Sequence, residues 1–409
     1  MSNNDGETPI KGIKYCIRCC TPETQEGVDF DELGICTACR SSEEKMHIDW
    51  AKREAELSKI LEKAKSEAGN NYDCILPISG GKDSFFQAHI LTKKYKMKPL
   101  AVTFSHNWFS ETGVYNLQRC LEVFDLDHIQ FTPARGLVNR LSKKSLNVIG
   151  DTCWHCHSGV GAFPLQIATK FNIPLLVWGE SIAENDGRAT YSNPKHTFDR
   201  DYFTKVSARL TSDEMVGDTL SSKDLHPFSL PSHKEIEDSG VWGLHIGDYM
   251  FWDEERQTEW IKKEYGWKET EMEGAYKGYK SAECIMAGMH DFTCYLKRGF
   301  GRSTQQAAVD VRNGLLTRSE AFDLVREYEQ KRPGALDYYL KITGMSEDEF
   351  YTAMVENRLD ILKDTEIPID TKLSKNLERT VPFFEQLIEK HLDQPDVRIK
   401  RDQDKDKSE

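Results

Sequence analysis

One stretch constrains the fold of this 409-residue chain more than any other: Tyr72 to Ser84, which reads YDCILPISGGKDS. Its apolar run predicts a buried strand, and the glycine pair that follows predicts a tight turn into a helix. Glycine can adopt positive φ and leaves the backbone open to a ligand. The unpaired N–H groups at a helix start carry the positive end of the helix dipole, so this turn is suited to bind phosphate. An ordinary strand-to-helix turn is the alternative.

The six residues SGGKDS do not fit the pattern G-x-x-x-x-G-K-[ST], because that pattern has four residues between its two glycines whereas Gly80 and Gly81 are adjacent. They resemble instead the PP-loop of the ATP pyrophosphatases, which cleave ATP between its α- and β-phosphates. Asp83 is a candidate Mg²⁺ ligand or simply the first-turn acid of its helix. The resemblance implies that ATP binds to Ser79, Gly80, Gly81, Lys82, Asp83 and Ser84.

Strand and helix patterns alternate from this loop to about residue 178. Strands are predicted at 99–104, 128–132 and 173–178, and helices at 84–95, 113–124, 137–147 and 160–171. This alternation predicts a doubly wound α/β fold with a parallel sheet covered on both faces. Ligands of such sheets bind beyond the carboxyl ends of the strands, where strand order reverses. We therefore expect Thr103, Ser105 and Gly179 to help bind the nucleotide. Glu180 is a candidate catalytic residue, with contact to adenosine, metal or an amide, or else a helix cap.

Four of the eleven cysteines form two C-x-x-C pairs near the N-terminus, Cys16 with Cys19 and Cys36 with Cys39. Two such pairs supply the four thiolates of a tetrahedral zinc site, and the intervening turn residues are typical of a zinc ribbon. Residues 48–70 follow as an amphipathic linker helix.

A third pair, Cys153 and Cys156, lies in GDTCWHCHSG. Three interpretations compete. The pair can hold a second metal or an iron–sulfur cluster, with Cys284 or Cys294 as a further ligand. Cys156 can act as a catalytic nucleophile. The two thiols can also be buried structural residues.

The net charge of −13 and the pI near 5.5 argue against a surface built to bind a long nucleic acid. No run of 18 apolar residues and no signal peptide is present, so the sequence predicts a cytoplasmic protein with no membrane association.

Together, the motifs YCIRC, CTAC, SGGKDS, PLAVTFSHNW, GDTCWHCHSG and IPLLVWGE are similar to those of the N-acetyl sugar amidotransferases. The similarity continues through IGDYMFWD, EYGW and residues 297–321. It implies conversion of a sugar N-acetyl group into an acetamidino group through an O-adenylyl imidate, with release of AMP and pyrophosphate. It also implies a substrate from O-antigen, lipopolysaccharide or nonulosonic-acid pathways, either an acetamido sugar or a nucleotide sugar. Ammonia is expected from a separate glutaminase resembling that of imidazole glycerol phosphate synthase, sometimes with a cyclase-like subunit.

Arg298 and Arg302 occupy a glycine-punctuated segment and are candidates to bind a substrate carboxylate or phosphate, or else are surface arginines. Trp242, Trp252, Trp260 and Trp267 can stack on a ligand or belong to the core. The predicted domains are a zinc ribbon (1–47), a linker helix (48–70), an ATP pyrophosphatase domain (71–235), a mixed or helical domain for substrate or partner (236–395) and a disordered tail (396–409).

Two rival functions remain open from the sequence. A tRNA thiolase with an iron–sulfur cluster also combines a PP-loop, a zinc ribbon and further cysteines. A non-catalytic zinc-ribbon adaptor is the second rival, but the intact glycine loop argues against it.

Overall fold

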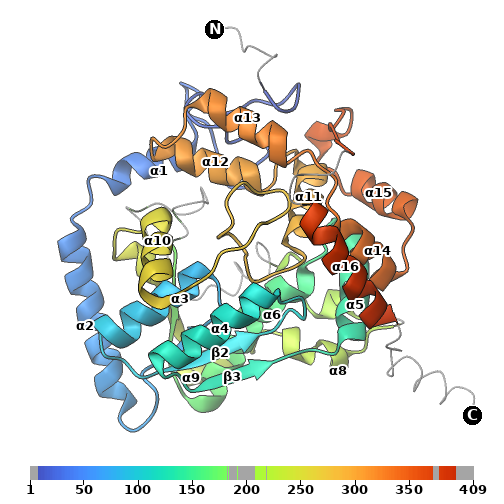
Figure 1. Cartoon of the computed structure of the whole chain (residues 1–409). Coiled ribbons are helices and arrows are strands. Elements are labelled where there is room, and N and C mark those ends of the chain that lie inside the picture. The colour runs from blue at the N-terminus through green and yellow to red at the C-terminus, as the bar shows by residue number, and fades with distance from the viewer. Residues whose placement is uncertain are drawn as a thin grey trace, which may run out of the picture.

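The computed structural model describes residues 8–181, 183, 191, 208–217, 219–371 and 377–392. Its centre is a five-stranded parallel sheet in the order β3-β2-β1-β4-β5 (Figure 1). The strands are β1 (Cys74–Pro77), β2 (Pro99–Phe104), β3 (His128–Phe131), β4 (Leu175–Trp178) and β5 (Trp242–His245). The α/β class and the parallel sheet predicted from the sequence are therefore confirmed.

Successive side chains of the strands enter two different cores because they alternate between the faces of the sheet. In β1, Cys74 and Leu76 pack in one cluster with side chains of α2 (Trp50–Ala68), α3 (Lys82–His89), α4 (Glu111–Phe124) and α10 (Glu254–Tyr265). Ile75 packs in the other with α5 (Arg135–Ile149), α6 (Trp154–Phe171) and α9 (His233–Ser239). Both faces of the sheet are thus covered.

Most predicted elements between residues 48 and 178 are present, with small shifts at their ends. The helix after the glycine loop continues from α3 as one π-helical turn, η1 (Ile90–Lys94). Helix α6 starts at Trp154, earlier than expected, and so includes Cys156. Strand β5 was not predicted, although it pairs with β4 over its full length.

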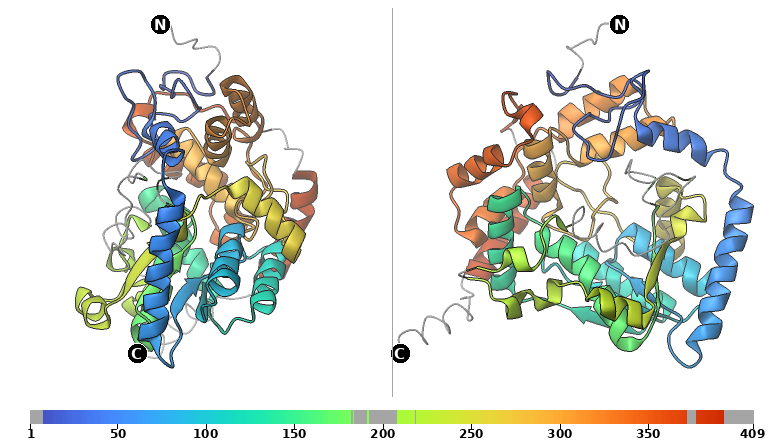
Figure 2. Two further views of the ribbon diagram at one scale, coloured as in Figure 1. Left: turned by 90° about the vertical axis from the view of Figure 1, so that its left-hand side faces the viewer. Right: turned by 180° about the vertical axis from the view of Figure 1, so that it is seen from behind.

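Further helices lie outside the layers that cover the sheet. α12 (Arg302–Arg312) and α13 (Arg318–Tyr328) pack on the N-terminal segment, at the end of the molecule away from the sheet, whereas α14 (Ala335–Thr343) and α15 (Glu347–Glu356) pack on α5 (Figures 1 and 2). Arg318 donates from Nε to the carbonyls of Cys16 (2.9 Å) and Cys19 (3.0 Å), which ties this segment to α13. The helices concerned are α1 (Thr37–Lys45), α11 (Ala287–Arg298), α12 (Arg302–Arg312), α13 (Arg318–Tyr328), α14 (Ala335–Thr343), α15 (Glu347–Glu356), η7 (Asp360–Leu362) and α16 (Leu377–Leu392).

The tryptophans singled out in the sequence belong to the core rather than to a stacking platform. Trp252 and Trp267 are buried in the cluster on the α3 face, and Trp242 and Trp260 pack against it. The described part of residues 181–241 contains, besides α9, only the short elements η4 (Asp213–Met215), α8 (Ser222–Leu225) and η5 (His226–Phe228); η6 (Ile246–Asp248) follows β5. The predicted tail, 396–409, lies outside the described residues. No described helix is both long and apolar enough to cross a membrane.

Candidate functional site

The glycine loop leaves the carboxyl end of β1, the central strand, from which the sheet order runs outward in both directions. Gly80 has φ of +82°, and a Cβ there would lie 2.8 Å from both Gly113 O and Leu117 N of α4. The loop therefore needs glycine for its conformation and for its close approach to α4. Ser84 Oγ donates to Gly81 O (3.0 Å), and α3 then begins at Lys82. This is the strand, turn and helix start predicted from the sequence.

Three carboxylates meet beside this loop. Asp83 lies in the first turn of α3, Glu180 follows β4 and Glu254 is the first residue of α10, and one oxygen from each lies within 4.8 Å of the others. Carboxylate oxygens are the ligands that Mg²⁺ prefers, so the group is suited to hold it. Asp83 and Glu180 were candidates from the sequence, whereas Glu254 was not. Only its place beside IGDYMFWD hinted at a role.

Two lysines balance these carboxylates. Lys82 Nζ lies 2.6 Å from Asp83 Oδ1 and 3.6 Å from Glu254 Oε1, and Lys280 pairs with the other oxygen of Glu254. Burial alone would lower the pKa of Lys82, but Asp83, Glu254 and Glu180 outweigh it and raise the pKa. Burial would likewise raise the pKa of Glu254, yet Lys280 and Lys82 lower it to about 2.

Glu180 behaves differently from its two partners. Its side chain faces the cavity. The negative charge of Asp83 is the larger cause, and desolvation the second, of a rise in its pKa to about 8. Like charges at this distance disfavour full ionisation of the group. A bound divalent cation would remove that conflict.

The loop and carboxylates open into a cavity of about 320 Å³. Its opposite wall comes from the segment between residues 279 and 306 and includes Glu283 and Arg302. Glu283 Oε1 accepts from Ser79 Oγ (3.4 Å), while its buried Oε2 has no hydrogen-bond partner among the described residues. Burial raises the pKa of Glu283. No sequence pattern pointed to this glutamate, because it approaches the loop only through the packing of the C-terminal segment.

Of the two candidate substrate-binding arginines, only Arg302 reaches the cavity. It donates from Nε (2.6 Å) and Nη2 (3.1 Å) to the two carboxylate oxygens of Asp291, so these two N–H groups of the guanidinium already have partners. Arg298 instead lies 3.5 Å from Glu26 of the N-terminal segment.

The remaining nucleotide candidates lie around the loop without lining this cavity. Thr103 Oγ1 donates to Ile78 O (2.8 Å), and Ser105 Oγ accepts from Asn107 N (3.3 Å). Both are buried. Gly179 stands against Asp83, since a Cβ there would lie 3.4 Å from Asp83 Cβ. Thr103 thus holds the carbonyl of the residue before the loop, and Ser105 holds the turn after β2.

Cys153 is the N-cap of α6 and Cys156 lies in its first turn; neither lines the 320 Å³ cavity, although Cys156 is near enough to Glu283 of its lining to be affected by that charge. Burial raises the pKa of Cys156 to about 12, with Glu283 adding to the shift, and burial also raises the pKa of Cys153 well above its usual value. Among the described residues, neither belongs to a group of three or more metal ligands within 4.8 Å of one another. Their chemical role stays a prediction.

The four N-terminal cysteines converge as the spacing predicts. Their sulfur atoms are buried and all lie within 4.8 Å of one another, with Cys16 Sγ 3.9 Å from Cys39 Sγ and Cys19 Sγ 3.7 Å from Cys36 Sγ. A zinc ion with bonds of about 2.3 Å to four thiolates separates them by about 3.8 Å, so the residues fit a structural zinc ion. Backbone N–H groups of Cys36 and Cys39 point at these sulfurs.

A larger cavity of about 700 Å³ lies between the cysteine ribbon, the start of α10 and the end of α12. Glu254 contributes to its lining and contacts Lys82 of the smaller cavity. Phe251 and Arg256 are exposed at its edge. It provides room for a second ligand next to the carboxylates.

Comparison with known proteins gives two partial matches. Residues 254–370 match the family model described as LPS biosynthesis protein WbpG-like, C-terminal domain. The chain is also 29% identical over 107 residues to uncharacterized protein MJ1599 of Methanocaldococcus jannaschii. That alignment spans 26% of this chain and 38% of the relative.

The family match covers less than a third of the chain but includes part of the site. It begins at Glu254 and contains Lys280, Glu283 and Arg302. The C-terminal half of the site therefore lies in a segment similar to a domain named for lipopolysaccharide biosynthesis, which agrees with the coarse pathway class suggested by the sequence.

Proposed function

We propose that this protein is an ATP-dependent amidotransferase that converts the N-acetyl group of a sugar into an acetamidino group. The observation that carries the proposal is the cavity at the carboxyl end of β1. There the glycine loop, Asp83 and Glu180 lie opposite Glu283 and Arg302, which the segment similar to WbpG-like proteins supplies together with the third carboxylate, Glu254. The proposed sugars are those of O-antigen, lipopolysaccharide or nonulosonic-acid biosynthesis.

In this proposal the glycine loop binds the β- and γ-phosphates of ATP. Asp83, Glu180 and Glu254 would hold Mg²⁺, which when bound offsets negative charge on the departing pyrophosphate. In the structure, Lys82 forms ion pairs with Asp83 and Glu254, and Lys280 forms one with Glu254. With a cation in place, both ammonium groups become available to phosphate oxygens, where preorganised charge lowers the barrier.

The chemistry overcomes the low reactivity of an amide in two steps. The amide oxygen attacks the α-phosphorus of ATP, and the bond from that phosphorus to the bridging oxygen breaks as pyrophosphate leaves. The product is a protonated O-adenylyl imidate. Ammonia adds to its carbon and loses one proton, and the C–O bond then breaks so that AMP leaves with the electron pair. An acetamidinium group remains on the sugar.

Glu283 is our candidate for the group that accepts the proton from the added ammonia. It lines the cavity, has an oxygen without a partner among the described residues and has a raised pKa because it is buried. A carboxylate whose pKa lies nearer to neutral pH is a more effective general base than one with an ordinary pKa.

The larger cavity is the proposed place of the sugar. Its position beside Glu254 would put an acceptor next to the α-phosphate, and Arg256 at its edge can meet an acidic sugar or a nucleotide diphosphate. A separate glutaminase, in some systems with a cyclase-like partner, is the proposed source of ammonia.

The test is mass spectrometry of candidate acetamido sugars incubated with the protein, ATP, Mg²⁺ and ammonium. Replacement of the acetamido oxygen by NH, with AMP and pyrophosphate formed in equal amounts, is the expected result. Lys82→Met should lower the rate about 100- to 1,000-fold, whereas the exposed control Lys59→Met should not. No change in any sugar, together with transfer of sulfur to tRNA, would establish the thiolase alternative instead.

A further inference from the structure

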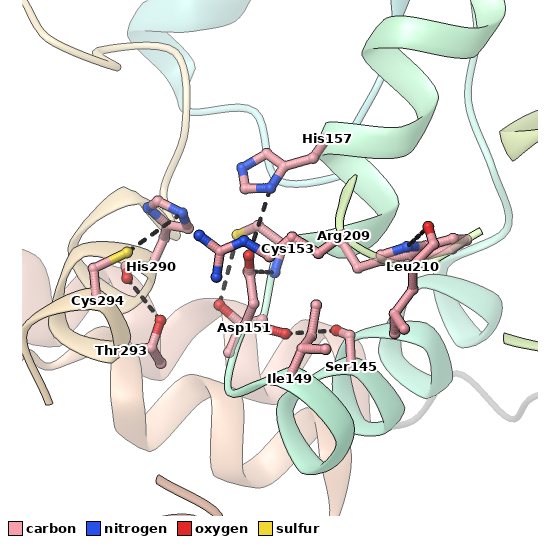
Figure 3. Close-up of polar contacts among 12 residues, drawn as sticks. Ser145, Ile149, Asp151, Cys153, His157, Arg209, Leu210, His290, Thr293 and Cys294 are labelled. Carbon is pink, nitrogen blue, oxygen red and sulfur yellow. Dashed lines mark hydrogen bonds and ion pairs between the residues drawn. The ribbon is translucent and has the colours of Figure 1, made fainter. Parts of the chain in front are cut away.

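A second cluster of ligating side chains lies apart from the residues used above, between the start of α6 and helix α11 (Figure 3). Asp151 precedes α6, and His157 lies in its first turns. His290 and Cys294 are four residues apart on α11 and so share one face of that helix. One ligand atom each from Asp151, His157 and His290 lies within 4.8 Å of the others. Cys294 Sγ lies 3.9 Å from His290 Nε2.

We propose that Asp151, His157 and His290 form a second transition-metal site, with Zn²⁺ as the ion that fits them best and Cys294, which lies beside His290 but outside this group of three, as the fourth ligand. Nothing in the proposed amidotransferase reaction is needed for this inference. It also differs from the sequence prediction, which placed the second metal on Cys153 and Cys156.

The ligands are already oriented by neighbouring groups, as metal ligands in proteins usually are. His290 Nδ1 donates to Asp291 Oδ1 (3.1 Å), which in the neutral ring leaves the lone pair on Nε2, the atom nearest Cys294. Asp151 Oδ1 accepts from Cys153 N (2.6 Å), so Oδ2 is the oxygen that lies 3.5 Å from His157 Nδ1. The loop that carries Asp151 is itself held by Ser145 Oγ, which donates to Asp151 O (2.6 Å).

The donor set selects the class of metal. Two imidazoles, one carboxylate and one thiolate supply four ligands and two negative charges, which suits a tetrahedral dication of borderline softness. Mg²⁺ and Ca²⁺ prefer six or more oxygen ligands and are excluded on that ground. Arg209 reaches the same cluster (Figure 3). Its Nη2 also donates to Glu26 Oε2 (3.2 Å). A polar network without metal is therefore the competing explanation.

The site would join two parts of the molecule and extend to the catalytic cavity. Asp291, the partner of His290, also holds Arg302, which lines that cavity. A metal at His290 would thus fix α11 against the loop before α6 and position Arg302 through Asp291. Arg302 is here a residue positioned by the proposed metal site.

The first measurement is the zinc content of the full-length protein after dialysis to remove weakly bound ions. We expect two zinc ions per chain, one in the cysteine ribbon and one here. His290→Asn and His157→Asn should each retain one, while the exposed control His233→Asn should retain two. A wild-type protein that holds one zinc even after incubation with excess Zn²⁺, or histidine variants that hold two, would overturn the proposal.

Cobalt substitution separates the two sites even if a histidine variant fails to fold. In a variant with Cys16, Cys19, Cys36 and Cys39 all replaced by serine, the remaining Co²⁺ should show the charge-transfer band of a single thiolate, and the further change Cys294→Ser should remove that band. Absence of a cobalt–thiolate band in the folded ribbon variant would favour the metal-free polar network.

Discussion

Replacement of Gly80 by alanine tests the packing of the glycine loop most directly. The positive φ of +82° costs an L-residue about 1–2 kcal/mol. The new Cβ would also lie 2.8 Å from two backbone atoms of α4, which cannot move away as a flexible side chain can. Overpacking of this kind costs about 1–3 kcal/mol. We therefore expect Gly80→Ala to lower the free energy of unfolding by about 2–5 kcal/mol.

Gly240 provides a control, because it is in the left-handed region with φ of +62° but has no atom within 4 Å of the position that a Cβ would take. Gly240→Ala should lose only the conformational part, about 1–2 kcal/mol. Urea denaturation followed by tryptophan fluorescence measures both losses. Pyrophosphate at a hundred times its dissociation constant should stabilise Gly240→Ala by about 2.7 kcal/mol and Gly80→Ala by much less. Equal losses of stability in the two variants would refute the argument that the loop is packed against α4.

Three further predictions concern the carboxylates and the ribbon. Glu254→Gln should weaken Mg²⁺ binding at least tenfold by removing a charged ligand, while the exposed Glu259→Gln on the same helix should not, as measured by calorimetry. Burial raises the pKa of Glu329 from 4.5 to about 7, so the protonated carboxyl adds about 3 kcal/mol to the free energy of unfolding below pH 4.5, and this contribution is lost as the pH rises through 7. Denaturation at pH 5 and pH 8 should therefore show a smaller difference in stability for Glu329→Gln than for the wild-type protein. An equal difference in the two proteins would contradict the assignment. Cys16→Ser should lose the ribbon zinc, whereas the neighbouring Cys20→Ser should keep it, and equal zinc contents would argue against the four-cysteine site.

Local sequence patterns predicted the features that depend on near neighbours. The strand, glycine turn and helix start around Gly80, the alternation up to β4 and the four-cysteine ribbon all follow from short-range periodicity or spacing. Strand β5 was missed because its four residues lie among aromatic residues without a clear alternation, and its pairing with β4 depends on a distant segment.

The site shows the same division. Asp83 and Glu180 follow strand ends, so the rule for parallel sheets predicts that they meet. Glu254 and Glu283 join them only because α10 and the segment before α11 pack over the loop. Arg302 was a candidate substrate-binding residue and lines the cavity, but its pairing with Asp291 depends on the geometry of α11 and α12.

The sequence by itself determined the glycine turn after β1 and the four cysteines that can bind zinc, because those features follow from residue type and local spacing. Only the tertiary structure decided that Glu254 completes the carboxylate group and that His290 meets Asp151. Such contacts join residues more than a hundred positions apart or on separate elements. They form because the apolar faces of those elements are buried against one another. The local sequence does not indicate which polar groups this packing will bring together.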